Sequence, residues 1–213
     1  MTTAPQPHIA VLGAGHTGPI LAKVLTEAGY AVSIAASGDP DRIALIMSFL
    51  APDAKPRWAA DAVAESDIVI LALPLHRFGA LDPAWFTGKT VIDTMNYWPP
   101  VDGVQDLFED PDRGSSEIVR DRLPGATVVK SFNHIGYHEL DDARRPAGAP
   151  DRRALGVAGD DPEAVELIAT VLDRVGYDPI TLMPLTAGRA LQPGGPVFGA
   201  DLTQDRFAEE IAS

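Results

Sequence analysis

The sequence predicts an α/β fold: a doubly wound, mostly parallel sheet with helices on both faces and a small C-terminal α+β extension. Three observations predict it. Apolar runs of strand length alternate with amphipathic segments of helix length. Residues 67–74 are almost continuously apolar, as in a parallel strand that is covered on both faces. A Gly-x-Gly-x-x-Gly turn joins the first apolar run to the first helical segment.

This glycine turn lies within residues 8–37, which read as strand, turn, helix and strand. The order is that of a Rossmann dinucleotide-binding unit. Gly13 is expected to make the tight turn, Gly15 to let the backbone approach a pyrophosphate, and Gly18 to let the helix pack on the strand. The predicted cofactor-binding turn comprises Gly13, Ala14, Gly15, His16, Thr17 and Gly18.

Composition narrows the class of protein. The 213 residues carry a formal net charge of −13, which argues against nucleic acid or an anionic membrane as a partner. The chain has no cysteine, so it offers no disulfide, thiolate nucleophile or cysteine-bound metal. Met1–Pro7 lacks the basic flank and apolar core of a signal peptide, and no apolar run reaches the length of a membrane span. We expect a cytoplasmic protein.

The rest of the chain continues the alternation in order. We expect a dinucleotide-binding domain over residues 1–150 and a strand–helix–strand extension over 151–213 packed on it. Asp160 and Asp161 are expected to cap the helix of this extension. Strands are predicted at 58–60, 67–74, 90–93, 126–131, 153–158 and 177–183. Helices are predicted at 41–50, near 65, at 78–86 with an interruption at Pro83, at 116–123, at 162–175 and near the C-terminus. A long functional loop is predicted at 96–114.

Ligands of such sheets bind outside the carboxyl ends of the strands. The second strand ends at Ser37 rather than at the Asp or Glu that would bind ribose hydroxyls, and Arg42 follows one helical turn later. This favours NADP, whose 2′-phosphate Ser37 and Arg42 could bind. NAD would be favoured instead if Asp39 or Asp41 pointed at the ribose.

Three further strand ends supply candidates. Leu73 and Pro74 end the most buried strand on the nicotinamide side, and His76 could donate to substrate or phosphate. Asn96 is followed by Tyr97 and Trp98, whose rings could stack on a flat ligand or seal the loop onto its own domain. Ser131 and Asn133 could bond a nicotinamide carboxamide, and Lys130 could be an edge charge.

No nucleophile with an adjacent base stands out, so no catalytic side chain is assigned. His134 and His138 have the spacing of helical metal ligands, but Gly136 lies between them and no further ligands follow, so no metal is expected. Hydride transfer between two bound rings fits such a site, because positioning and exclusion of water matter most there.

From Ile9 to about Gly199 the chain resembles the NADPH:coenzyme F420 oxidoreductase family. The resemblance rests on the glycine turn, Ala36-Ser37, Leu73-Pro74, residues 91–96, residues 129–133, residues 157–161 and Leu185-Thr186-Ala187-Gly188-Arg189.

The resemblance implies that NADP lies on Ala14, Gly15, His16 and Thr17, and that Ser131 contacts the nicotinamide. Gly38 stands where the family has an arginine beside the serine. The deazaflavin F420 would lie over the nicotinamide as co-substrate, and the family implies a homodimer. Arg189, Lys130 and Arg77 are the cations near matched positions.

Two other functions stay open. One is an NADP-dependent reductase of a small carbonyl or imine, with His76 or Tyr97 as proton donor. The other is a non-catalytic NADP-binding redox sensor, which would bind the nucleotide and turn over no acceptor.

Overall fold

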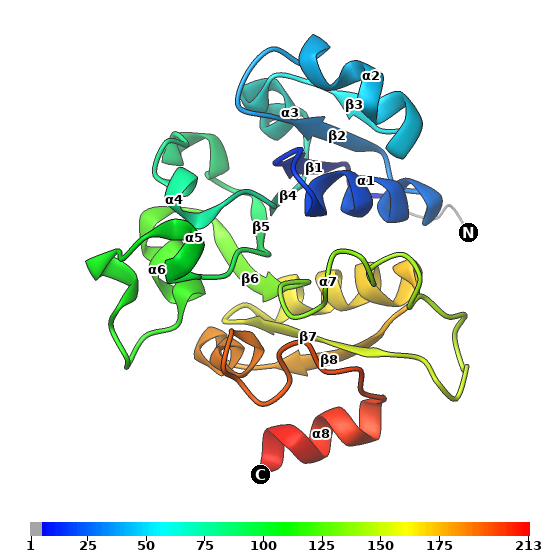
Figure 1. The fold of residues 1–213 in the computed structure, drawn as a ribbon, viewed down its shortest axis with the longest axis vertical. Helices are drawn as coiled ribbons and strands as arrows, with labels where there is room; N and C mark the ends of the chain where they lie inside the picture. The colour runs from blue at the N-terminus through cyan, green and yellow to red at the C-terminus, as the bar shows by residue number, and fades with distance from the viewer. Residues whose placement is uncertain (1–5) are drawn as a thin grey trace.

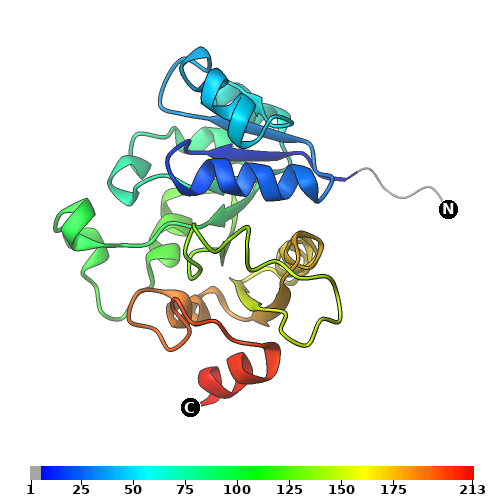
Figure 2. The ribbon, with the colours of Figure 1, turned by 45° about the vertical axis from the view of Figure 1, so that its right-hand side comes forward.

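The computed structural model describes residues 6–213 (Figures 1 and 2). Of the segment Met1–Pro7, which was compared above with a signal peptide, residues 1–5 lie outside the described residues. The strands of the described part form one eight-stranded sheet in the order β3-β2-β1-β4-β5-β6-β7-β8. All neighbours pair in parallel except β6 and β7. The predicted mostly parallel sheet is confirmed. The strands are β1 Ile9–Leu12, β2 Val32–Ala35, β3 Lys55–Pro56, β4 Ile68–Leu71, β5 Thr90–Asp93, β6 Thr127–Ser131, β7 Ala154–Gly159 and β8 Asp178–Leu182.

Helices cover both faces of this sheet, as a doubly wound fold requires. Alternate side chains of β1 show why: Ile9 and Val11 pack with α1, α2 and α7, whereas Ala10 and Leu12 pack with α3 and α6. The α-helices are α1 Thr17–Glu27, α2 Asp41–Leu50, α3 Ala59–Glu65, α4 Leu75–Phe78, α5 Pro99–Asp102, α6 Ser115–Arg122, α7 Pro162–Val175 and α8 Gln204–Ala212. Three 3-10 helices are η1 Pro83–Phe86, η2 Asp106–Phe108 and η3 Leu185–Leu191.

The C-terminal residues extend the same sheet. β7, α7 and β8 lie where the sequence predicted them, and Figures 1 and 2 show α8 at the opposite end of the molecule from α2 and α3. Asp161 caps α7, accepting from the backbone N–H groups of Glu163 and Ala164 at 2.9 and 3.0 Å. Asp160 does not share this cap; it accepts from Leu185 N at 2.9 Å instead.

Three local predictions were wrong. The short strand lies at Lys55–Pro56 and not at 58–60, where alanine-rich residues begin α3. Pro56 is tolerated there because β3 is an edge strand. The helix expected at 78–86 ends at Phe78, and Asp82 caps a separate 3-10 turn that starts at Pro83. The predicted loop at 96–114 contains α5 and η2.

Among residues 6–213, no helix combines the length and apolar character that crossing a bilayer requires.

Candidate functional site

A large cleft of about 1180 Å³ opens at the carboxyl ends of β1, β2, β4 and β5. This is the edge at which doubly wound sheets bind their ligands. Figure 1 shows α4 and α5 on this side of the sheet. The residues that line the cleft are 12–17, 35–38, 58–60, 72–77, 80, 81, 85, 94–96, 98, 101 and 102.

The glycine turn forms the floor of the cleft, and two of its glycines are sterically required. Gly13 has φ +123°, and a Cβ there would lie 2.0 Å from the carbonyl oxygen of Ala72. A Cβ on Gly18 would lie 1.7 Å from the carbonyl oxygen of Gly13. The close packing expected of Gly18 is therefore present, and the contact is made with the turn itself.

Gly15 is the open position of the turn. No atom lies within 4 Å of the place a Cβ would take, and Gly15 lines the cleft. Helix α1 begins two residues later, at Thr17, so its unpaired N–H groups and positive dipole end lie at the same place. The residues present therefore fit a pyrophosphate.

The wall of the cleft is aromatic. All three tryptophans of the chain, Trp58, Trp85 and Trp98, line it, and Trp58 and Trp98 are about half exposed. They come from the turn before α3, from η1 and from the turn before α5. Of the three tryptophans, only Trp98 was a candidate from the sequence, because nothing local indicates that the other two share its cavity. Flat rings bound here would have aromatic faces to stack on.

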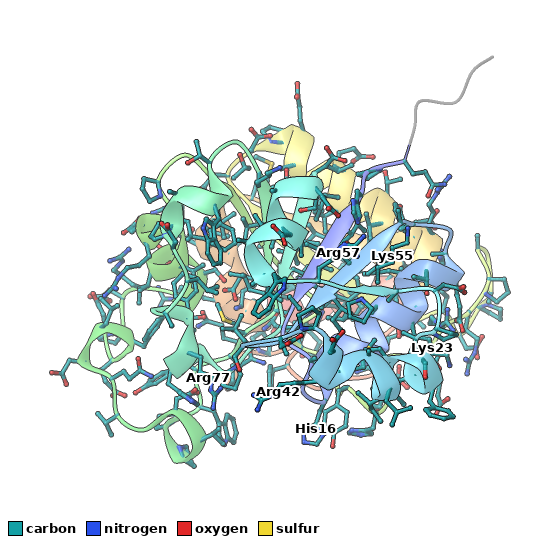
Figure 3. The ribbon with its side chains drawn as sticks, turned by 90° about the horizontal axis from the view of Figure 1, so that it is seen from above. His16, Lys23, Arg42, Lys55, Arg57 and Arg77 are labelled. Atoms are coloured by element: carbon teal, nitrogen blue, oxygen red, sulfur yellow. The ribbon has the colours of Figure 1, made fainter. Side chains whose placement is uncertain are left out.

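Two exposed arginines lie near the cleft, and one of them, Arg77, lines it. Ser37 lines the cleft, and the exposed guanidinium of Arg42 stands at the start of α2. Arg77 of α4 also lines the cleft, and Figure 3 shows Arg77, Arg42 and His16 in that order along one side of the molecule. Among residues 6–213, no carboxylate pairs with Arg42 or Arg77.

Asp39 and Asp41, the acidic residues near Ser37, do not point at the position where the ribose would bind. The carboxylate of Asp39 accepts from the backbone N–H of Asp41 at 2.9 Å, at the start of α2. Neither Asp39 nor Asp41 lines the cleft, and Arg42 does not line it either. The cleft lining beside Ser37 is instead Gly38, Ala36 and Ala35.

On the β4 and β5 side, His76 and Asp102 meet within the cleft lining. Imidazole Nδ1 of His76 lies 3.1 Å from Asp102 Oδ1. Asp102, at the end of α5, also accepts from the backbone N–H of His76 at 3.2 Å and of Trp98 at 3.0 Å. Nothing local in the sequence indicates Asp102, which lies 26 residues from His76.

Two predicted nicotinamide contacts, Ser131 and Asn133, lie behind the cleft. The Ser131 hydroxyl donates to Gly156 O at 2.9 Å, and Asn133 Nδ2 donates to Leu191 O at 2.5 Å. Asn133 Nδ2 also donates to the side chain of Asn96 at 2.9 Å. The structure therefore brings Asn96 to the cleft, with Asn133 as its support.

Lys130 is not the edge charge that the sequence suggested. Its ammonium and the carboxylate of Asp93 are both 0 % exposed and lie 3.5 Å apart. Lys130 Nζ also donates to Met95 O at 3.2 Å, and Asp93 accepts from the Ser116 hydroxyl at 2.5 Å. Burial lowers the pKa of Lys130, and the charge of Asp93 opposes this shift. Lys130 and Asp93 therefore hold β6 against the end of β5 and the residues that follow it.

Tyr97 and Arg189, two other residues considered as ligand contacts, bond to residues of the loop at 96–114 instead. The Tyr97 hydroxyl bonds to Glu109 and accepts from Gln105 N at 3.0 Å, and its ring stacks on Phe108. The bond to Glu109 raises the pKa of Tyr97. Arg189 donates to the carbonyl oxygens of residues 112 and 111 at 3.1 and 2.5 Å. Tyr97 and Arg189 are absent from the cleft lining.

His134 and His138 do not form a metal site in this structure. His134 is buried, and its Nε2 accepts from Gly156 N at 3.0 Å, whereas His138 is exposed. Within residues 6–213, no group of three or more His, Cys, Asp or Glu side chains is placed to hold a metal ion.

The class of protein that this fold and cleft define is an NAD(P)-dependent oxidoreductase of the Rossmann type. The family model described as NADP oxidoreductase, coenzyme F420-dependent, matches residues 8–97, so this part of the chain is similar to that family. The resemblance inferred from the sequence is thereby confirmed.

Solved structures extend the likeness beyond the matched segment. The hypothetical protein SMa0349 from Sinorhizobium meliloti is 29% identical with a TM-score of 0.77, covering 93% of this chain and 96% of its own. A protein from Arthrobacter sp. FB24, provisionally described as an F420-dependent NADP reductase, is 25% identical with a TM-score of 0.74, covering 93% and 100%.

The fold is shared more widely. An imine reductase from Myxococcus stipitatus, solved with NADP⁺, is 16% identical with a TM-score of 0.59, covering 87% of this chain and 58% of its own. This likeness concerns the fold alone. No curated protein sequence matches the chain.

Proposed function

We propose that the protein transfers hydride reversibly between NADP(H) and the deazaflavin coenzyme F420. The observation that carries the proposal is the cleft: a glycine turn fit for a pyrophosphate, the guanidinium of Arg77 and a tryptophan-lined wall in one cavity. The family match and the likeness to the Arthrobacter protein support F420 as acceptor.

The order of strands assigns the two halves of the dinucleotide. The pyrophosphate would lie on Ala14, Gly15, His16 and Thr17, at the N-terminus of α1. The adenosine half would then extend over β2 toward Ser37, and the nicotinamide half over β4 and β5 toward Leu73, Pro74 and Asn96. NADPH supplies the hydride, and the protein positions the two rings and excludes water.

We propose that Ser37, Arg42 and Arg77 together bind the 2′-phosphate of NADP. Gly38 leaves the position beside Ser37 without a side chain, and Arg77 reaches the same cavity from α4. Arg77 would replace the charge that the resemblance led us to expect at residue 38. Of the three cations considered for the F420 side, Lys130 is buried, Arg189 is bound to the loop, and Arg77 is the one proposed at the 2′-phosphate.

The test is a fluorescence titration with NADPH and NADH, because a nucleotide in this cleft would contact all three tryptophans. Arg42→Ala with Arg77→Ala should weaken NADPH binding about 10- to 100-fold and leave NADH binding within about twofold. Arg122→Ala, at the end of α6, removes an exposed arginine away from the cleft and is the matched control. Equal losses for both nucleotides would contradict the 2′-phosphate site.

The acceptor is tested by adding oxidised F420 to the NADPH complex and following its absorbance. Bleaching with NADPH and not with NADH would support the proposal. Tight NADPH binding without bleaching would refute F420 as acceptor and favour either a reductase of another small molecule or a redox sensor.

The same proposal includes the assembly and the organisation of the chain. We propose a homodimer, and the exposed apolar side chains of Leu45, Ile46, Phe49 and Leu50 on α2 support a subunit contact. Light scattering after size exclusion measures this directly. We also propose a cytoplasmic location, a dinucleotide-binding unit at 1–150 and an extension at 151–213.

A further inference from the structure

The cleft contains a carboxylate–histidine pair, formed where α4 and α5 meet. Asp102 has 3 % of its side chain exposed and His76 has 40 %. The carboxylate accepts from two backbone N–H groups as well as from the imidazole, so its position is fixed. Because Asp102 contacts Nδ1, the ring presents Nε2 away from the carboxylate. Within the part of the chain that the structure describes, Nε2 has no hydrogen-bond partner.

The pair lies on the side of the cleft where the acceptor is proposed to bind. His76 follows β4 by five residues, and Asp102 ends the helix after β5. The adenosine half of the dinucleotide is proposed over β2, with Arg77, the residue after His76, reaching its 2′-phosphate. The side chains of this pair therefore face the nicotinamide half and whatever ring lies over it.

Few other groups that line the cleft could give up a proton. The ionisable side chains in the lining are His16, His76, Arg77 and Asp102. His16 belongs to the glycine turn, and its ring stacks on Tyr137 with centroids 5.1 Å apart. Asp102 is buried and its carboxylate oxygens accept three hydrogen bonds, and arginine keeps its proton in proteins. His76 is left as the proton donor.

We propose that His76, positioned by Asp102, donates the proton that must accompany hydride transfer to the acceptor. The inference rests on the proposed function. Hydride adds to a ring carbon, and the displaced electron pair moves to a conjugated ring nitrogen. That nitrogen takes the proton from His76 as the Nε2–H bond breaks and leaves its electron pair on Nε2. NADPH is oxidised, the acceptor is reduced, and water reprotonates the exposed imidazole.

Asp102 is a positioning residue in this scheme. After the proton leaves, the neutral imidazole must keep its remaining proton on Nδ1, and a carboxylate 3.1 Å away favours that tautomer. The same carboxylate stabilises the imidazolium from which the proton is given. In the reverse reaction the neutral ring accepts the proton, so His76 acts as base.

The first experiment uses two substitutions that keep a hydrogen-bonding side chain at residue 76 but remove its ability to donate a proton. In His76→Asn, the amide can still donate to Asp102 where Nδ1 did; in His76→Gln, an amide reaches the Nε2 position. Neither amide is an acid. Both variants should bind NADPH within about twofold of wild type and lose about 100- to 10,000-fold in kcat for F420 reduction.

The second readout is the pH profile. Reduction by wild type should slow as pH rises and the reverse reaction should speed up, whereas His76→Gln should be flat in both directions. The charged groups beside His76 are Asp102 on α5 and Arg77 on α4. Asp102→Asn should lower kcat and leave the KM for NADPH unchanged, and Asp106→Asn in the same loop is its control.

The third readout needs no acceptor. Nitrogen NMR of the free protein should find the neutral ring of His76 protonated on Nδ1, and this preference should be lost in Asp102→Asn. Protonation on Nε2 instead would overturn the pair. Wild-type F420 reduction that survives unchanged in His76→Gln would overturn the proton donor and leave the proposed function intact. Absence of F420 reduction in wild type would overturn the proposed function, and with it the role of His76.

Discussion

Acidification should destabilise the protein through one buried histidine. His134 lies wholly inside the fold, with Nε2 accepting from Gly156 N at 3.0 Å and Nδ1 3.3 Å from the side-chain oxygen of Asn133. Burial, together with the smaller effect of the charges of Arg153 and Lys130, lowers the pKa of His134 from 6.5 to about 3. The imidazole is therefore neutral in the native state.

The size and sign of the effect follow from linkage. Between pH 6.5 and about pH 3, the unfolded chain binds a proton at His134 that the native protein does not. The free energy of unfolding is therefore fully retained above pH 6.5 and falls by about 1.4 kcal/mol for each pH unit below it. Lowering the pH from about 7 to about 5 should cost about 2 kcal/mol through this residue alone.

Urea unfolding, followed by circular dichroism at a series of pH values, measures the effect. In His134→Gln, an amide oxygen can replace Nε2 as acceptor for Gly156 N, and it does not titrate. The variant should lose about 2 kcal/mol less than wild type over the same pH range. His138→Gln, which removes an exposed histidine four residues away, is the matched control.

The comparison also separates His134 from the carboxylates. The arginine partners of Asp121 lower its pKa, and Lys23 and Arg144 lower that of Asp141 against the opposing effect of burial. Both carboxylates therefore lose stabilisation in acid as well, but they do so equally in wild type and in variant. Parallel pH profiles for wild type and His134→Gln would refute the reasoning.

Two further predictions concern residues that support the cleft. Lys130→Met should lower the free energy of unfolding by about 3–5 kcal/mol, because it leaves the buried Asp93 carboxylate unpaired. Adding Asp93→Asn should restore most of this free energy. A cost of Lys130→Met below about 1 kcal/mol in urea unfolding would contradict the buried pair. Gly18→Ala should abolish NADPH binding in the fluorescence titration, because its Cβ would lie 1.7 Å from Gly13 O and displace the turn; wild-type affinity would show that the turn can relax.

Much of the fold could be predicted from the sequence because its signals are local. The apolar run of β4, the capped helix α7 and the glycine turn each depend on residues a few positions apart. The errors were also local: at 58–60 and 78–86, tryptophan and proline gave ambiguous signals, and tertiary packing decided between helix, turn and strand.

The candidate site was only partly predictable, because its decisive contacts join residues far apart in the chain. The glycine turn, Ser37 and Asn96 reach the cleft as strand ends must in a parallel sheet. Two of these contacts depend on which strands are neighbours: the hydrogen bond between Asn96 and Asn133, and the buried pair of Lys130 and Asp93. No periodicity encodes such a pairing.

By itself, the sequence determined a doubly wound fold with a phosphate-binding turn, since alternating periodicity and three glycines suffice for that. Only the tertiary structure placed three tryptophans in one cavity, brought Arg77 into the cavity that Ser37 lines, and set the carboxylate of Asp102 against His76. The physical reason is that a local pattern fixes the conformation of a segment, whereas the chemistry of this cleft depends on which segments the sheet brings together.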